Sequence, residues 1–113
     1  MRRSESKFIS PTALLHAKQL GQGVRAARLA RNSTQEAMAE RARMSALTWL
    51  KIEKGEVSVA MGAWLSALEI TGLLDRVAQA VDPKQDLVGE QLRKEQLRRR
   101  ARRSEETDAN FDF

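Results

Sequence analysis

The segment from residue 33 to residue 55 constrains the fold of this chain more than any other part of the sequence. It predicts two short helices. The first follows a Ser-Thr pair, and either side chain can cap its N-terminus. Ser45 caps the second helix, which is expected over Ala46–Lys54 and ends at Gly55. The tight turn between the two helices is therefore expected at Arg43-Met44.

This spacing is typical of a helix-turn-helix, in which one helix lies in the major groove of DNA and the other crosses the backbone. The two helices need small residues where they meet, and Ala39 and Ala42 supply them. They also need large apolar residues for a core, which Met44, Trp49 and Ile52 supply. The same spacing occurs in helical hairpins that bind nothing, so the interpretation depends on the flanking sequence.

The remainder of the chain predicts further helices and no β-strand of useful length. Ser10 and Pro11 mark the start of a first helix that runs to about Arg31. A fourth helix is expected after Ser58, and a fifth over residues 73–82. The predicted fold class is therefore all-α. The expected parts are a flexible N-terminal arm, a five-helix domain and a flexible, disordered charged tail, over residues 1–10, 11–82 and 83–113.

Composition narrows the classes of function. The chain has 113 residues and a formal net charge of +5, which suits a nucleic-acid binder but also fits non-specific binding. It has no cysteine, which excludes disulfides and thiolate metal sites. No nucleophile–base set, phosphate loop or metal cluster is visible, so we expect no enzyme activity, metal or cofactor. The absence of a membrane-length apolar run or a signal peptide predicts a cytoplasmic protein.

The flanks of the two short helices resemble a known family. The run L-G-Q-G-V-R-A-A-R-L-A-R-N-S-T-Q precedes them, and I-E-K-G ends them. Over about residues 20–72 the chain resembles the XRE, or Cro/CI-type, regulators of bacteria and phages. The resemblance implies a lambda-repressor-like helix-turn-helix domain. It also implies that Gln35 contacts a DNA phosphate, and that an ion pair between Arg28 and Glu53 ties the recognition helix to the first helix.

The same resemblance implies that the outer face of the second helix of the motif contacts DNA. The matching positions are Ala46, Leu47, Leu50 and Lys51, with Thr48 near the backbone. Ser45 and Lys54, at the two ends of this helix, are further candidate DNA contacts. Family members commonly carry Arg, Gln, Asn or Ser here, whereas this face is mostly apolar. Leu47 and Leu50 suit thymine methyl groups, and Lys51 suits a guanine or a phosphate. Two alternatives stay open: DNA shape supplies much of the selectivity, or the face binds protein. Arg43 stands where the family usually has Gly.

A narrower resemblance comes from the pattern D-P-x-x-D-x-V/L-G-x-x-L, from Asp82 to Leu92, and the basic run after it. It resembles the HipB-like antitoxins, although the proline usual in that basic run is missing. The resemblance implies a homodimer that binds operator DNA, represses its own operon and holds a HipA-like kinase toxin inactive. The alternatives are a stand-alone XRE regulator, and a protein-interaction module that has lost DNA binding. The dimer interface is expected to be the fifth helix with the end of the fourth. The apolar side chains there are more than one small core needs, and they are Leu73, Leu74, Val77 and Val81.

The tail carries two blocks of opposite charge. Residues 84–103 are strongly basic, and residues 104–113 are acidic and include Phe111 and Phe113. Such blocks are typical of disordered arms. The basic run can contact DNA phosphates or bind an acidic face of a kinase partner. The sequence favours binding to the kinase partner, because DNA would repel the acidic end of the tail.

Overall fold

The computed structural model describes residues 8–111, with side chains for residues 8–107. Within this part of the chain the only regular elements are helices, which confirms the all-α class. Most of the predicted N-terminal arm, residues 1–7, lies outside the described residues. The elements are α1 (Pro11–Ala30), α2 (Gln35–Arg41), α3 (Ala46–Glu53), α4 (Met61–Ile70), α5 (Leu74–Ala80), the 3-10 helix η2 (Pro83–Gln85) and α6 (Leu87–Phe111).

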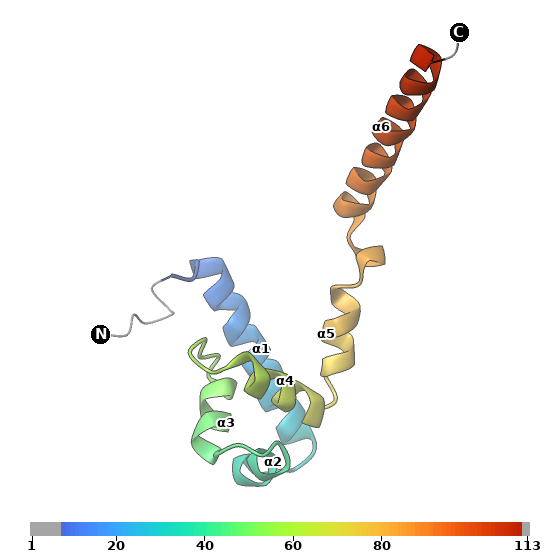
Figure 1. The fold of residues 1–113 in the computed structure, drawn as a ribbon. Helices are drawn as coiled ribbons and strands as arrows, with labels where there is room; N and C mark the ends of the chain where they lie inside the picture. Colours follow the sequence, from blue (N-terminus) through green and yellow to red (C-terminus); the bar gives the residue numbers. More distant parts are fainter. Residues whose placement is uncertain (1–7, 112–113) are drawn as a thin grey trace. The chain divides into compact units, whose positions relative to one another are not determined.

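The chain divides into two compact units between Asp75 and Arg76, within α5. The first unit contains α1 to α4. In it α3 contacts α1, α2 and α4, and α2 also contacts α4, so that the two short helices lie against the two longer ones (Figure 1). The division falls earlier in the chain than Asp82, where the sequence predicts the domain to end.

Helix α1 runs without a break through two glycines that disfavour helix interiors. Ser10 caps it by accepting a hydrogen bond from Ala13 N at 3.1 Å, and Pro11 occupies its first turn. Gly21 is buried where α1 crosses the end of α3. A Cβ atom there would lie 2.8 Å from the backbone oxygen of Glu53 and closer still to that of Ile52. The missing side chain therefore allows the two helix backbones to meet.

The core of the first unit comes from all four of its helices. Val24 of α1, Met38 of α2, and Trp49 and Ile52 of α3 have no exposed surface. Helix α4 adds buried side chains from its last turns, and the full set of buried apolar residues is Val24, Met38, Ala39, Trp49, Ile52, Ala67 and Leu68. The inner face of α3 is therefore committed to packing, which leaves its outer face to other contacts.

The prediction of a disordered tail is wrong, because α6 is a helix of 25 residues. Asp82 and Asp86 explain its start. The Asp82 side chain accepts from Lys84 N at 2.9 Å and opens η2, and Asp86 Oδ1 accepts from Gly89 N at 2.9 Å and opens α6. Beyond Gly89 the described helix has neither Gly nor Pro, and Arg, Gln, Glu, Leu and Ala are good helix formers. The charge blocks alone therefore do not reveal this propensity. The acidic, aromatic end lies mostly outside the described side chains, and Phe113 lies outside the described residues.

None of the helices in residues 8–111 combines the length and apolar character that a membrane span requires.

Candidate nucleic-acid interface

The two short helices begin where hydroxyl side chains cap them. Thr34, rather than Ser33, caps α2, because its Oγ1 accepts from Ala37 N at 3.1 Å. Ser45 caps α3 by accepting from Thr48 N at 3.1 Å. These caps satisfy N–H groups that a helix leaves without partners, so each short helix begins at a fixed residue.

The turn between α2 and α3 lies at the predicted place and contains a strained residue. Arg43 has φ of 58°, a left-handed conformation that suits glycine and is costly for other L-residues. Backbone hydrogen bonds close the turn: Arg43 N donates to Glu40 O at 3.1 Å, and Met44 N donates to Ala39 O at 3.0 Å. Buried Ala39 lets the two helices approach closely. The helix-turn-helix is therefore formed with arginine at the position where glycine is usual.

One face of α3 is open to solvent. Leu47 is 60 % exposed, whereas Trp49, Ile52 and Glu53 on the opposite face are buried. None of the residues predicted on the outer face of α3 is buried. They are exposed Ser45, Ala46, Leu47 and Lys54, and half-buried Thr48, Leu50 and Lys51. The structure therefore leaves these seven residues at least partly accessible, and we call them together the outer face of α3.

A buried carboxylate joins α1, α2 and α3. Glu53 Oε2 accepts from Arg28 Nε at 2.6 Å and from Trp49 Nε1 at 2.5 Å. Glu53 Oε1 accepts from Arg28 Nη2 and from Gln35 Nε2, each at 3.0 Å. Arg28 Nη1 also donates to Ser33 O at 3.0 Å. The ion pair expected between Arg28 and Glu53 is thus present, and it is bidentate. It belongs to a larger network that fixes the start of α2 against the end of α3.

The network holds both charged groups in their ionised forms. Burial raises the pKa of the Glu53 carboxyl, but hydrogen bonds from Arg28, Gln35 and Trp49 and the Arg28 charge outweigh it. The pKa of Glu53 therefore lies below its ordinary value of 4.5. The hydrogen bond to Glu53 raises the pKa of Arg28, against the desolvation of its guanidinium group. With Arg28 only 8 % and Glu53 only 7 % exposed, each charge depends on the other for its solvation.

Gln35 is half-buried, and its amide group contacts the protein. One N–H of its Nε2 donates to Glu53. An amide nitrogen carries a second donor, which is the group a DNA phosphate accepts. The sequence alone does not reveal the bond to Glu53. It assigns Trp49 to the core and misses its hydrogen bond to Glu53, although the four-residue spacing on one helix is a usable signal.

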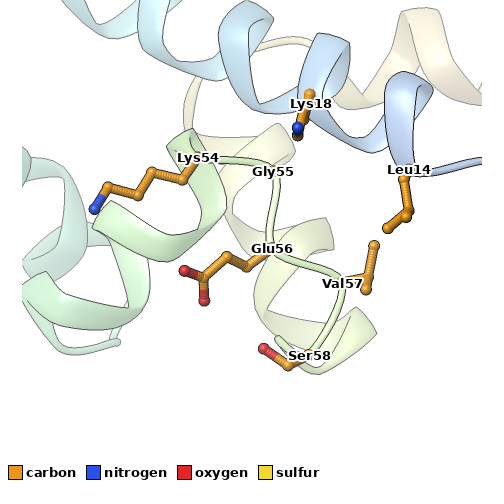
Figure 2. A pocket seen from close by; sticks show the side chains of 7 residues that line it. All are labelled: Leu14, Lys18, Lys54, Gly55, Glu56, Val57 and Ser58. Carbon is orange, nitrogen blue, oxygen red and sulfur yellow. The ribbon is translucent and has the colours of Figure 1, made fainter. Parts of the chain in front are cut away.

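A pocket of about 250 Å³ lies beside the C-terminal end of α3 (Figure 2). Leu14 and Lys18 of α1 line one side, and Lys54 and the loop Gly55–Ser58 line the other. Figure 2 shows the Lys54 side chain extending away from Leu14. Gly55 has φ of 76°, and a Cβ atom there would lie 2.7 Å from Lys18 N, so the loop leaves α3 in close contact with α1. Nothing in this lining resembles a metal site, and among the described residues no group of His, Cys, Asp or Glu could hold a metal ion.

The four-helix unit, the capped α2–α3 pair and the open face of α3 define a helix-turn-helix protein. A family model described as a helix-turn-helix domain matches residues 19–81, more than half of the chain. The chain therefore belongs to this family, whose domains are typical of DNA-binding regulators and are typically not enzymes. No curated protein and no solved structure matches the chain.

Proposed function

We propose that the protein is a sequence-specific DNA-binding transcriptional repressor of the XRE type, and that α3 is its recognition helix. The observation that carries this proposal is the division of α3 into two faces. Its inner face is buried and anchored through Glu53, whereas its outer face is accessible, with Leu47 at 60 % exposure. A rigidly held helix with one open face suits insertion into the major groove, which is wide enough to admit it.

The residues of the outer face divide by the DNA group that each suits. Leu47 and Leu50 suit thymine methyl groups, and the Lys51 ammonium group suits a guanine edge or a phosphate. Ser45 and Thr48 share a hydroxyl–hydroxyl hydrogen bond of 2.9 Å at the start of α3, where N–H groups also favour a phosphate. Gln35, at the start of α2, and Lys54, just after α3, suit contacts with DNA phosphates. Few polar side chains face the base edges, so DNA shape contributes to the selectivity.

We propose further that the protein acts as a homodimer. Leu73, Leu74 and Val77 are half-buried, and Val81 is 77 % exposed. Burial of these apolar side chains against a second copy removes them from water. A dimer also pairs two recognition helices with two half-sites, about 34 Å apart on one side of the duplex. A single short helix reads too few base pairs to select an operator.

The biological role that we propose is that of a HipB-like antitoxin in the bacterial cytoplasm. It represses its own operon and binds and neutralises a HipA-like kinase toxin. The support is the pattern from Asp82 to Leu92, whose two leading aspartates serve as caps for η2 and α6. A stand-alone XRE regulator would share the DNA-binding part of this proposal and lack the kinase.

The first experiment is a binding titration of the full chain with the DNA upstream of its own gene and with a scrambled duplex of equal length. We expect tighter binding to the upstream DNA, and Leu47→Asp should abolish this preference because it places a negative charge on the outer face. The control is Glu40→Asp, an exposed position on α2. Equal binding to both duplexes by the unaltered protein would refute operator recognition, and binding to neither duplex would favour the protein-interaction module.

The second experiment tests the antitoxin role. The product of an adjacent HipA-like kinase gene is coexpressed with the full chain, and copurification and relief of growth arrest are scored. Operator binding without any such partner would support the stand-alone regulator.

A further inference from the structure

Helix α6 carries an unusual concentration of positive charge. Between Arg93 and Arg103 there are seven basic residues and one acidic residue, a net charge of +6 in 11 residues. All described side chains from residue 91 to residue 107 are exposed. A helix of this length spans about 16 Å, which gives one net charge per about 2.7 Å. Duplex DNA carries one negative charge per about 1.7 Å of its axis, so the two charge densities are comparable.

The acidic residues of α6 leave most of its basic side chains without an ion pair within the described side chains. Lys94 pairs with Glu90 at 3.8 Å, and Arg93 donates to Pro83 O at 3.2 Å. The remaining basic residues form no ion pair within the described side chains. These are Arg98, Arg99, Arg100, Arg102 and Arg103, which we call the arginine segment. A disordered tail would let its acidic end fold back on the basic run. In a continuous helix Glu105 and Glu106 instead follow the arginine segment along the axis and mark where it ends.

The arginine segment covers a wide arc of the helix. At 100° per residue its five side chains spread over about 200° of the circumference, from Arg98 at one edge to Arg100 at the other. Leu97 and Ala101 occupy the remaining side. A flat acidic protein surface can reach only part of such an arc. A DNA groove has phosphates on both rims and admits a helix of about 10–12 Å diameter, so it can neutralise both edges together.

Repulsion among the arginines of α6 also favours the binding of an anion. Arg98 and Arg102, and Arg99 and Arg103, are four residues apart, a spacing at which like charges destabilise a helix. Phosphates that approach from both sides remove this repulsion. Binding and helix stability are therefore coupled in this segment.

We infer that the arginine segment of α6 is a second DNA-binding element, which contacts phosphates on both rims of a groove and does not read bases. This inference rests on the proposed function, since it adds a sequence-independent contact to the operator recognition of α3. It assigns the basic run to DNA rather than to the acidic face of a protein partner.

The test is a salt titration with the full chain, using the same two duplexes as above. The variant R98Q/R99Q/R100Q/R102Q/R103Q removes the charge and keeps good helix formers, and circular dichroism checks its helix content. The plot of log K against log salt should become shallower by about 0.9 for each phosphate that the variant no longer neutralises, or about 4.5 in total. Affinity should fall for both duplexes by the same factor, so that the preference for the upstream DNA stays unchanged.

Two double variants test whether both edges of the arc contact phosphates. R98Q/R102Q removes one edge and R100Q/R103Q removes the other, and each should make the salt plot shallower by about 2. The matched control is E105Q/E106Q, which lies in the same helix and should not make the plot shallower. An effect at one edge alone would overturn the inference, because a single flat face would then be sufficient.

Other outcomes separate this inference from the proposed function. If the five-residue variant keeps the salt dependence of the unaltered protein, the inference is wrong even though operator recognition stands. If that variant instead loses a copurifying protein partner, the arginine segment is a protein-binding surface. If the unaltered protein shows no preference between the duplexes but the variant still loses salt dependence, the inference stands and the proposed operator recognition fails.

Discussion

The amide nitrogen of Gln35 lies 3.0 Å from Glu53 Oε1 and donates a hydrogen bond to it. Gln35 is the first residue of α2, and Glu53 is the last residue of α3. The bond therefore connects the proposed phosphate contact to the buried ion pair with Arg28. The protein thus positions the amide group that we propose contacts a DNA phosphate. Substitutions at Glu53 are thus expected to affect both stability and DNA binding.

Removal of one partner of the Arg28–Glu53 pair should destabilise the protein strongly. Glu53→Ala leaves the buried guanidinium without its carboxylate, and we expect a decrease of about 3–5 kcal/mol in the free energy of unfolding. Urea unfolding of Arg28→Ala, Glu53→Ala and the double variant gives the coupling between them. The double variant should cost less than the sum of the two single variants. Additive effects would show that the pair does not act as a unit.

Stability should fall in acid because of Glu53. Its pKa is below 4.5 in the folded protein, so its contribution is fully present above the ordinary value and disappears as the pH falls through the lower, folded value. The unfolding free energy of the unaltered protein should therefore decline below about pH 4.5. In Glu53→Gln this part of the decline should be absent, although the variant is less stable at pH 7. An equally steep decline in both proteins would contradict the role of Glu53.

Glycine at position 43 should stabilise the fold. Arg43 has φ of 58°, and glycine adopts this region freely, so Arg43→Gly should raise the free energy of unfolding by about 0.5–1 kcal/mol. Arg43→Val should lower it, because a β-branched residue fits this region poorly. Asn32 offers a matched control, since it has φ of 51° and asparagine tolerates the left-handed region. Asn32→Gly should change thermal stability less than Arg43→Gly does.

The proposed DNA contacts should separate into two kinds. Gln35→Ala should weaken binding about equally for all duplexes, as removal of a phosphate contact does. Lys51→Ala should either relax the preference at one base pair or make the salt plot shallower by about one unit. Binding titrations with single-base-pair variants of the upstream DNA distinguish these effects. Unchanged affinity in both variants would favour a protein ligand for the outer face of α3.

The proposed dimer should depend on the apolar side of α5. Val77→Asp places a charge among half-buried apolar side chains and should yield a monomer by light scattering at micromolar concentration. The matched control is Gln79→Asp, an exposed position two residues further along α5. If the unaltered protein is itself a monomer, with and without DNA, the proposed interface is wrong.

Local features of the fold could be predicted from the sequence. Ser10, Ser45 and Gly55 act on neighbouring residues, so their effect on helix ends depends on local spacing alone. Trp49 and Ile52 were predictable as core for the same reason, because they repeat on one side of a short helix. The caps and the inner face of the helix-turn-helix therefore required no knowledge of the tertiary structure.

Features that depend on distant partners could not be predicted in this way. The Gln35–Glu53 bond joins residues 18 positions apart, and its geometry exists only after α2 packs on α3. The Arg28–Glu53 pair, 25 positions apart, came from resemblance to a family and not from spacing. The helix over the tail escapes prediction for a different reason. Its charge blocks are typical of disorder, and they conceal the helix-forming propensity of Arg, Gln and Leu.

Gly21 has a consequence for how this protein can diverge. Because the backbone of α3 occupies the place of its side chain, even a methyl group there must displace the last turn of α3. Gly21→Ala would thus shift the proposed recognition helix without altering any residue of its outer face. In a library of variants selected for repression of new operators, we expect glycine to be retained at position 21 and the residues of the outer face of α3 to vary. The position of α3 relative to α1 therefore depends on the absence of a side chain at residue 21.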